Sequence, residues 1–464
     1  MPFDPPCTVG PDSKEGAPEP TVHLYFPWWL HPAVAASVLI ALMLSVLWTV
    51  DDYSYALWQT PKYLTSNYLL TAACSALVFL AGIFISSGKR TKNYYELRVS
   101  ACTETTLVSI TKWFFGGALF GYAFWLVSAG VRGVNFGQLV AVFNLEPGAV
   151  SQVKQLSAPI TGITTLTQLA PLAIALATFL VRCSVVGMRK YIVVLVALGA
   201  FRAFFYAERL ALIEAVVPFA LVTVVVHRAS SRSRLSRFFS NWAPFLAVPG
   251  LWSIFGIFEY TRSWSFYRQT LGVSFWEFNS QRLLGYYVTA VNNSALYHGM
   301  VSDQYQSLDR SFAALWNAPL VGQLFGEPEV SGAESSMWWR MALARGGNPE
   351  YTNIGTFLVT DADLGTFLSM AYWFVLGVGI GILYSRMRKG HLVSLLMYCS
   401  SFVGILELLR IIYWTHGRFA PVLLGGVVLL IALHRVRGPE VRTRHRIRAS
   451  IPVSQVANIS EADR

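Results

Sequence analysis

The sequence predicts an all-α fold: a polytopic bundle of about ten transmembrane helices, with one large outward-facing, partly helical loop between spans 7 and 8. Only 13% of its 464 residues are charged and 54% are hydrophobic, whereas an average soluble domain has about 25% charged residues. The apolar residues occur in blocks of around twenty, the length that crosses a ~30 Å hydrocarbon layer. These observations exclude a soluble enzyme, a secreted disulfide scaffold and a disordered chain.

The chain begins with a polar segment. Residues 1–30 are rich in proline, contain several acidic residues, and lack the basic n-region and short apolar h-region of a signal peptide. We expect this segment to be a disordered cytoplasmic tail. The apolar runs between charged residues then predict ten spans, at 31–50, 67–87, 113–130, 159–181, 191–205, 209–227, 243–258, 364–385, 392–413 and 418–434.

The stretch 191–227 is apolar almost throughout but contains Arg202, Glu208 and Arg209. A single helix there would be about 55 Å long, far longer than the hydrocarbon layer. Basic residues near span ends are retained in the cytoplasm, and ten spans with both termini inside put 23 lysines and arginines inside and nine outside. A single span would put the basic cluster at 89–112 outside. We therefore expect two helices joined by a turn.

The predicted chain has five parts. They are the tail (1–30), a bundle of spans 1–7 (31–258), an extracytoplasmic loop domain (259–363), a bundle of spans 8–10 (364–434) and a basic cytoplasmic tail (435–464). The net charge of +11 is scattered over short loops without interleaved aromatic residues, so it indicates topology and contact with anionic lipids rather than nucleic acid. The five cysteines show no metal-ligand spacing, and we expect no metal or other cofactor.

Eight ionisable residues lie within or beside predicted spans, where each costs about 2.5–3.5 kcal/mol to insert. They are Arg202, Glu208, Arg209 and Glu214 in one hairpin, and Glu407, Arg410, His416 and Arg418 in another. Most of them fall at the outward ends of these hairpins. A guanidinium matches phosphate oxygens bidentately, so four arginines here predict a site for a lipid diphosphate. The alternative is structural ion pairing with the three glutamates.

The predicted loop domain contains 18 aromatic residues among 105. Aromatic faces suit sugar rings, although tryptophan and tyrosine also collect at membrane interfaces for packing reasons. The stretches 265–287 and 303–319 are typical of amphipathic helices on a membrane surface. The candidate sugar-binding residues are Trp338, Arg340, Arg345 and Tyr351.

Two acidic residues close the loop domain. Asp361 and Asp363 directly precede the eighth predicted span. Each is a candidate general base for an acceptor hydroxyl, and the alternative is a helix N-cap, a role that aspartate fills well. His298 and His416 are further candidates for the base. The sequence contains no nucleophile elbow, P-loop or zinc-protease motif.

Two patches of the chain resemble a known family. They are ALGAFRAFFYAERLALIEAVVPFALV, which contains the first charged hairpin, and YTNIGTFLVTDADLGTFLSMAYWFVLGVGIGILY, which spans the end of the loop domain and the next helix. Both are similar to segments of bacterial oligosaccharide repeat-unit polymerases, the O-antigen and capsule polymerase family. That family is related to O-antigen ligases and to GT-C-type membrane glycosyltransferases. The order of short loops, one large late loop and three closing spans also fits it.

The resemblance implies polymerisation of undecaprenyl-diphosphate-linked oligosaccharide repeat units at the outer face of the bacterial plasma membrane. It implies a metal-independent reaction in which the diphosphate-binding residues are Arg202, Arg209, Arg410 and Arg418. The four candidates for the general base stay open. The expected partners are the lipid-linked oligosaccharide, membrane lipids, a chain-length regulator and a flippase.

Two other functions stay open: glycan transfer of the O-antigen-ligase type, and transport of a polysaccharide or lipid. The long loop lacks a clear histidine motif of the kind that the ligases use. Transporters bury their charges at the membrane midplane, whereas the charges here fall near the outer ends of the spans. Both observations favour the polymerase.

Overall fold

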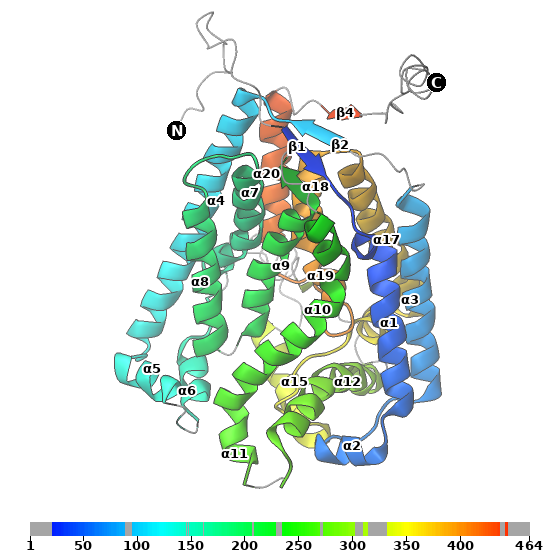
Figure 1. Ribbon diagram of the computed structural model, residues 1–464. Helices are drawn as coiled ribbons and strands as arrows, with labels where there is room; N and C mark the ends of the chain where they lie inside the picture. Colours follow the sequence, from blue (N-terminus) through cyan, green and yellow to red (C-terminus); the bar gives the residue numbers. More distant parts are fainter. Residues whose placement is uncertain are drawn as a thin grey trace, which may run out of the picture.

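The structure is a computed structural model that describes residues 21–88, 95–144, 146, 148–160, 162–206, 208–228, 234–269, 272–301, 310–313, 332–436 and 441–443. It is a bundle of roughly parallel and antiparallel helices (Figure 1). A small sheet caps one end of the bundle, and a group of short and oblique helices covers the other end.

Six helices of the described residues are long and apolar enough to cross a membrane. They are α1 (Pro32–Thr49), α3 (Ser66–Ser86), α4 (Ala101–Val131), η2 (Thr164–Leu169) continued by α7 (Ala170–Arg182), α10 (Arg234–Glu259) and α17 (Thr366–Arg388). Shorter apolar helices are α18 (Leu392–Ser401), α19 (Val403–Leu406) and α20 (Ala420–Arg435). The prediction of a helical membrane protein is therefore confirmed.

The stretch 191–227 forms two helices, α8 (Arg189–Phe205) and α9 (Arg209–Val225). They pack against each other as an antiparallel pair (Figure 1). Gly199 permits the close approach, because a Cβ atom there would lie 3.2 Å from the carbonyl oxygen of Ala211. The two helices predicted from the distribution of basic residues are thus present. Arg202, Glu208 and Arg209 lie at or near the turn between them.

A four-stranded sheet departs from the predicted all-α fold. Its strands are β1 (Thr21–Leu24), β2 (Tyr95–Arg98), β3 (Val226–Arg228) and β4 (Val441–Thr443), all antiparallel in the order β3-β1-β2-β4. Each strand has only three or four residues, so none carries a recognisable period of its own. Four distant segments satisfy one another's backbone hydrogen bonds here, which local hydropathy does not reveal.

This sheet corrects the predicted tails. Residues 21–30 were assigned to a disordered segment, but they form β1 and the 3₁₀ turn η1 (Trp28–Leu30). Val22 and Leu24 alternate inward and are buried in the hydrophobic core. Part of the predicted basic tail is also ordered, as β4. Residues 1–20 lie outside the described residues.

Basic residues gather at the sheet end of the bundle. Arg182 lies in the last turn of α7, Arg189 begins α8, Arg388 ends α17 and Arg435 ends α20. All four helix ends lie toward the sheet in Figure 1. These four basic helix ends therefore share one end of the bundle.

Helices α3 and α17 form the closest helix pair of the bundle. A Cβ atom at Gly82 would lie 2.5 Å from the Phe374 carbonyl oxygen, and one at Gly377 would overlap the Phe79 carbonyl oxygen. Such contacts let two backbones touch, as small residues do at membrane helix interfaces. The glycines are needed for space rather than for unusual backbone angles, since neither has a positive φ.

We expect Gly377→Leu to prevent stable packing of α17 on α3, because a side chain there would overlap backbone atoms that cannot move aside. The protein should lose its folded form in thermal unfolding measured in detergent. Gly379→Leu is the matched control: Gly379 is exposed on the same helix, and a Cβ atom there meets no atom within 4 Å. Equal melting of the two variants would contradict this account of the interface.

The end of the bundle opposite the sheet is built from shorter elements. They are α2 (Asp52–Leu57), α5 (Phe136–Phe143), α6 (Ala149–Leu156), the π-turn η3 (Tyr260–Trp264), α11 (Ser265–Tyr267), α12 (Phe275–Val301), α15 (Gly332–Gly346) and α16 (Thr356–Leu364). The turn between α8 and α9 points toward this end (Figure 1). Most of the predicted loop domain therefore lies on the side to which the charged turn points.

Helix α12 is not the surface helix that the aromatic pattern predicted. It is buried along much of its length, including polar residues. Asn292 accepts from the backbone of Tyr63 at 2.7 Å and donates to Pro61, and Asn293 donates to the carbonyl of Tyr351 at 2.6 Å. These amides hold two loops to the helix, which explains why polar groups are buried there. The second predicted amphipathic stretch, 303–319, lies largely outside the described residues.

Candidate functional site

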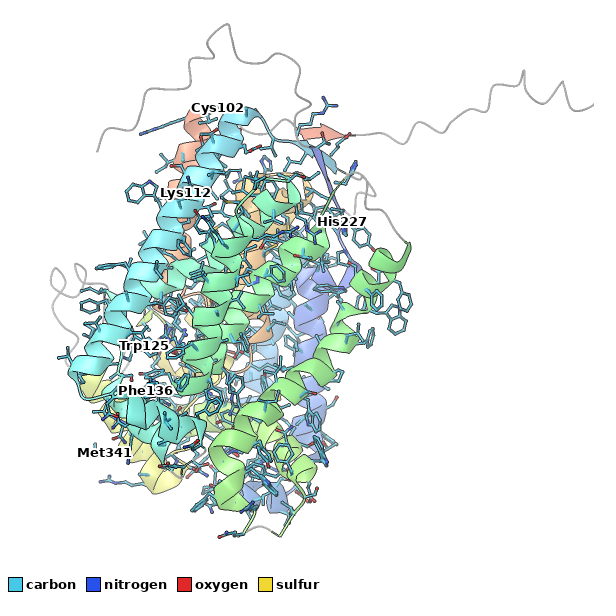
Figure 2. All side chains as sticks on the ribbon, turned by 60° about the vertical axis from the view of Figure 1, so that its left-hand side comes forward. Cys102, Lys112, Trp125, Phe136, His227 and Met341 are labelled. Carbon is cyan, nitrogen blue, oxygen red and sulfur yellow. The ribbon has the colours of Figure 1, made fainter. Side chains whose placement is uncertain are left out.

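Glu208 is the centre of an ion-pair cluster at the turn between α8 and α9. Its carboxylate accepts from Nε of Arg202 at 2.6 Å and also pairs with Arg418. Nη1 of Arg202 donates to Oγ1 of Thr167 at 2.9 Å, and its guanidinium lies 5.7 Å from the ring centre of Trp125, which Figure 2 labels on α4. Arg202 is therefore held by contacts from three separate elements.

Arg418 connects this turn to the segment between α19 and α20. Its Nε and Nη2 each donate to a carboxylate oxygen of Glu214 at 3.1 Å, and the Tyr413 hydroxyl donates to the same carboxylate. Because Arg418 also pairs with Glu208, two hairpins distant in sequence meet at one point. The side chains of Arg418 and Glu208 are 17% and 20% exposed, whereas that of Glu214 is 3% exposed. Glu214 is therefore buried inside the cluster, whereas Arg418 and Glu208 are partly accessible to solvent.

Arg209 belongs to a different cluster. Its guanidinium pairs with Glu259 at the end of α10 and lies 4.1 Å from the ring centre of Phe255. Nε of Arg282, on α12, lies 3.4 Å from the other carboxylate oxygen of Glu259. Glu259 is fully buried, so one carboxylate compensates two guanidinium groups inside the protein. Among the described residues, Arg209 therefore pairs with a different carboxylate from those that hold Arg418.

Arg282 extends this second cluster toward the surface. Its Nη1 donates to the Tyr351 hydroxyl at 3.1 Å, and its Nη2 pairs with the half-exposed Glu350. Sequence reasoning missed Glu259, Arg282 and Glu350. Glu259 stands at the end of a predicted span, and that position was the one available signal. Its partners Arg209 and Arg282 lie on either side of it along the chain, in other helices.

Arg410 has its own partner. Its Nε lies 2.7 Å from the carboxylate of Glu407, which is buried. The two residues stand in the turn that follows α19 rather than on a continuous helix. The pairs Arg202–Glu208 and Glu407–Arg410, which the structural alternative anticipated, are both present.

The charges of these clusters balance. The sequence places four arginines against three glutamates in the two hairpins. The structure adds Glu259 from α10, Arg282 from α12 and Glu350 from the segment before α16, which makes five of each. The paired groups are Arg202, Arg209, Arg282, Arg410 and Arg418 with Glu208, Glu214, Glu259, Glu350 and Glu407. Any anion that binds here must therefore use hydrogen-bond donors and local geometry rather than a net positive charge.

Asp363 anchors the short described segment 310–313. One carboxylate oxygen accepts from the Tyr297 hydroxyl at 2.8 Å, and the other accepts from the backbone N–H and the hydroxyl of Ser311 at 2.9 and 2.6 Å. Burial raises the pKa of Asp363 to about 6, although the hydrogen bonds from Ser311 and Tyr297 favour its charged form. The N-cap alternative is wrong, because Asp363 lies in the last turn of α16 and Gly365 precedes α17.

Asp361 and His298 form a pair between α16 and α12. Nε2 of His298 lies 2.8 Å from Oδ2 of Asp361. The side chain of His298 is 19% exposed and that of Asp361 is 7% exposed. The Tyr68 ring of α3 packs against the imidazole, edge to face, with ring centres 5.1 Å apart. Asp361 lies inside α16, so it is not an N-cap either. Two of the predicted candidates for the base, Asp361 and His298, thus contact each other.

His416 lies in the turn before α20 and is exposed. Its Nδ1 accepts from the backbone N–H of Arg418 at 3.3 Å. The Thr415 hydroxyl next to it hydrogen-bonds the Tyr372 hydroxyl at 2.9 Å, and the Tyr372 ring packs edge-on against Phe312. Through these contacts the arginine cluster is connected to the segment that Asp363 holds.

The four predicted sugar-binding residues do not form one surface. Tyr351 is buried against Arg282, and Trp338 is half-buried against the Tyr297 ring. Arg340 and Arg345 are exposed on α15. Sugar binding by these four residues stays a prediction, and the burial of Tyr351 against Arg282 separates it from the exposed arginines.

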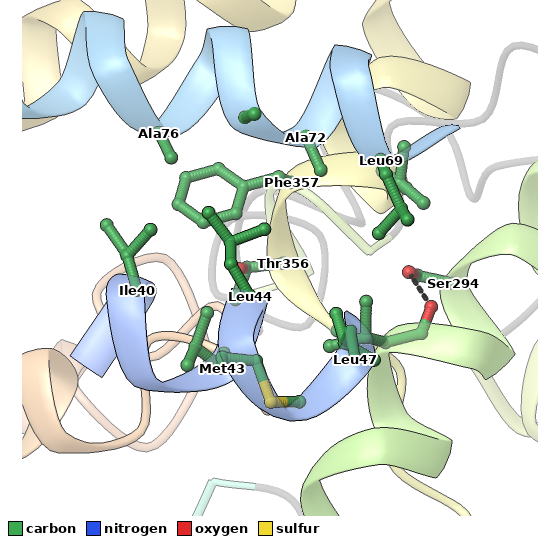
Figure 3. A pocket seen from close by; sticks show the side chains of 15 residues that line it. Ile40, Met43, Leu44, Leu47, Leu69, Ala72, Ala76, Ser294, Thr356 and Phe357 are labelled. Carbon is green, nitrogen blue, oxygen red and sulfur yellow. Dashed lines mark hydrogen bonds between the residues drawn. The ribbon is translucent and has the colours of Figure 1, made fainter. Parts of the chain in front are cut away.

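An apolar cavity lies near the helical turns that carry His298 and Asp361. Residues of α1, α3, α12 and α16 line it, and the side chains of α1 and α3 face each other across it (Figure 3). Ser294 and Phe357 line it, and each lies four residues, or about one helical turn, before a member of the pair. Leu69 also lines it, next to Tyr68 in the chain. The pair thus stands just beyond one end of a cavity with hydrophobic walls.

Comparisons with protein-family models, curated proteins and solved structures found no match for this chain. Among the described residues, no group of three or more histidine, cysteine, aspartate and glutamate side chains is arranged to hold a metal ion.

Proposed function

We propose that this protein polymerises undecaprenyl-diphosphate-linked oligosaccharide repeat units into a surface polysaccharide at the outer face of the bacterial plasma membrane. The growing glycan is transferred from its lipid diphosphate to the terminal sugar of another lipid-linked unit. The sheet end of the bundle then faces the cytoplasm, and the end with α12 and α15 faces outward.

The arrangement of the helices supports this topology. Ten spans follow if α8, α9, α18–α19 and α20 cross the membrane together with the six longer helices. Strands β1 and β4, which lie nearest the two ends of the described chain, and the basic helix ends then lie on the cytoplasmic side, as basic residues near span ends prefer. The charged turn after α8 lies on the outward side, where a lipid diphosphate is found.

The observation that carries the proposal is the meeting of Arg202 and Arg418 on Glu208, at an accessible point between two hairpins. Arg418 directs three of its five N–H donors to Glu208 and Glu214 among the described residues, so two donors can reach phosphate oxygens. The glutamates hold each guanidinium in a fixed orientation. Preoriented donors of this kind stabilise the charge that develops on a leaving diphosphate.

The apolar cavity supports a lipid-linked substrate. Its walls are formed by aliphatic and aromatic side chains of α1, α3 and α16, such as Ile40, Leu44, Leu69 and Phe357 (Figure 3).

The test is deletion of the gene followed by gel analysis of the surface polysaccharide. We expect a band of single repeat units in place of the ladder of the parent strain. Complementation with the intact gene should restore the ladder. Long polymer that stays on its lipid carrier would indicate a ligase, and loss of every surface band would indicate a transporter; either result would contradict the polymerase.

A further inference from the structure

The proposed function needs a group that removes the proton of the acceptor hydroxyl. Resting on that function, we propose that His298 is this general base and that Asp361 is its positioning residue. Hydrogen bonds and burial distinguish His298 from the other three candidates for the base, Asp361, Asp363 and His416.

The geometry determines which nitrogen of His298 is available. An ionised carboxylate only accepts hydrogen bonds, so Nε2 must carry a proton when it lies 2.8 Å from Oδ2 of Asp361. In a neutral imidazole the other nitrogen then holds a lone pair. Nδ1 of His298 is buried and has no hydrogen-bond partner among the described residues. An unpartnered buried acceptor is costly, and a substrate hydroxyl that donates to Nδ1 would relieve that cost.

The other three candidates are already engaged. Asp363 accepts three hydrogen bonds, from Tyr297 and Ser311, and holds the segment 310–313. Oδ2 of Asp361 is directed at His298, while its Oδ1 is buried and has no hydrogen-bond partner among the described residues; the contact through Oδ2 makes Asp361 the group that orients the imidazole. His416 uses its Nδ1 on the backbone of Arg418 and lies beside that permanent positive charge, which disfavours taking up a proton.

The surroundings of His298 suit a base that must meet a sugar. Its side chain is 19% exposed although the Nδ1 atom itself is buried, so the acceptor hydroxyl reaches Nδ1 only by displacing the groups that cover it. The groups that face it are Asp361 from α16 and the Tyr68 ring from α3. Tyr297, the preceding residue, binds Asp363, and the Arg310 guanidinium lies over the Tyr297 ring at 5.7 Å. Asp361 therefore lies against the imidazole, whereas Asp363 and Arg310 lie against the neighbouring Tyr297.

The proposed step is a single displacement. The acceptor hydroxyl oxygen bonds to the anomeric carbon of the donor sugar, and the bond between that carbon and the diphosphate oxygen breaks. The electron pair of the broken bond leaves with the polyprenyl diphosphate, near Arg202 and Arg418. The hydroxyl proton passes to Nδ1 of His298, and Asp361 stabilises the resulting imidazolium until the proton is released to water.

The experiment uses the full-length protein in detergent and the polyprenyl-diphosphate-linked oligosaccharide that the deletion strain accumulates. His298→Gln keeps a donor toward Asp361 but supplies no base, so we expect kcat to fall about 10²–10⁴-fold while KM changes less than about threefold. Added imidazole should restore part of the activity of His298→Ala, which leaves room for it. Asp361→Asn should lower kcat at least about tenfold without rescue by imidazole. His391→Gln, an exposed histidine before α18 at the sheet end, is the matched control and should behave as the parent.

The outcomes separate the two proposals. If the parent protein makes no polymer from this substrate, the proposed function is wrong. If the parent makes polymer but His298→Gln retains kcat within about fivefold, the base is not His298 and the function stands. If the variants lose kcat but imidazole gives no rescue in a His298→Ala protein that melts like the parent, the histidine is structural and the inference is wrong.

Discussion

Replacing Arg418 with alanine is expected to abolish long surface polymer. The change removes the donors that Arg418 presents to phosphate, and it leaves Glu208 with Arg202 and Glu214 with Tyr413 as their remaining partners. Loss of one preoriented donor at a developing charge typically costs about 10²–10³ in rate. The measurement is the polysaccharide ladder of a deletion strain that expresses the variant, together with the amount of variant protein in the membrane.

Two further variants make this result specific. Arg418→Lys should rescue poorly, because an ammonium group does not replace a planar, bidentate guanidinium. Arg132→Ala is the matched control, since Arg132 is exposed and stands just after α4, whose far end reaches the same end of the bundle. Combining Arg418→Ala with Glu214→Gln removes the buried charge that the single change leaves behind. A full-length ladder from Arg418→Ala would contradict the assignment of this cluster to the diphosphate.

Replacing Glu259 with alanine is expected to destabilise the fold more than any other single charge removal in the described residues. Glu259 is fully buried between Arg209 and Arg282, so its loss leaves two guanidinium groups inside the protein with less compensation. Breaking a buried ion pair in this way costs about 3–5 kcal/mol. The measurement is thermal unfolding of the purified protein in detergent, with the yield of folded protein as a second readout.

The controls for Glu259 use the same region. Glu277→Ala removes an exposed glutamate from the first turn of α12 and should change stability by less than about 0.5 kcal/mol. Adding Arg282→Met to Glu259→Ala removes one of the uncompensated charges and should recover part of the lost stability. If Glu259→Ala melted like the parent protein, the carboxylate would not be the link between α9, α10 and α12 that its contacts indicate.

The partners of Arg418 and Arg209 could not be predicted from the sequence. Both arginines stand at hairpin ends, and both were expected to bind one diphosphate. Arg418 does share Glu208 with Arg202, but Arg209 turns to Glu259, 50 residues further along the chain. Nothing in the local sequence of α9 indicates the partner of Arg209, because that partner depends on which helix packs against this end of α9.

The same limit applies to the candidates for the base. His298 and Asp361 are 63 residues apart and were predicted as separate alternatives. They became a pair only because α12 is buried and lies against α16, whereas its aromatic residues had indicated a membrane-surface helix. The Asn292 and Asn293 side chains, which hold the neighbouring loops to α12, are the contacts that keep it there.

The amino-acid sequence by itself determined that this is a helical membrane protein, where its apolar runs lie and that the stretch 191–227 breaks into two helices. These properties follow from composition and from charges counted along short segments, so they are local. The tertiary structure alone decided the terminal sheet, the partner of each arginine and the pairing of His298 with Asp361. An ion pair or a three-residue strand is stabilised by groups brought together from distant segments, and only the packing of the helices brings them within hydrogen-bond distance.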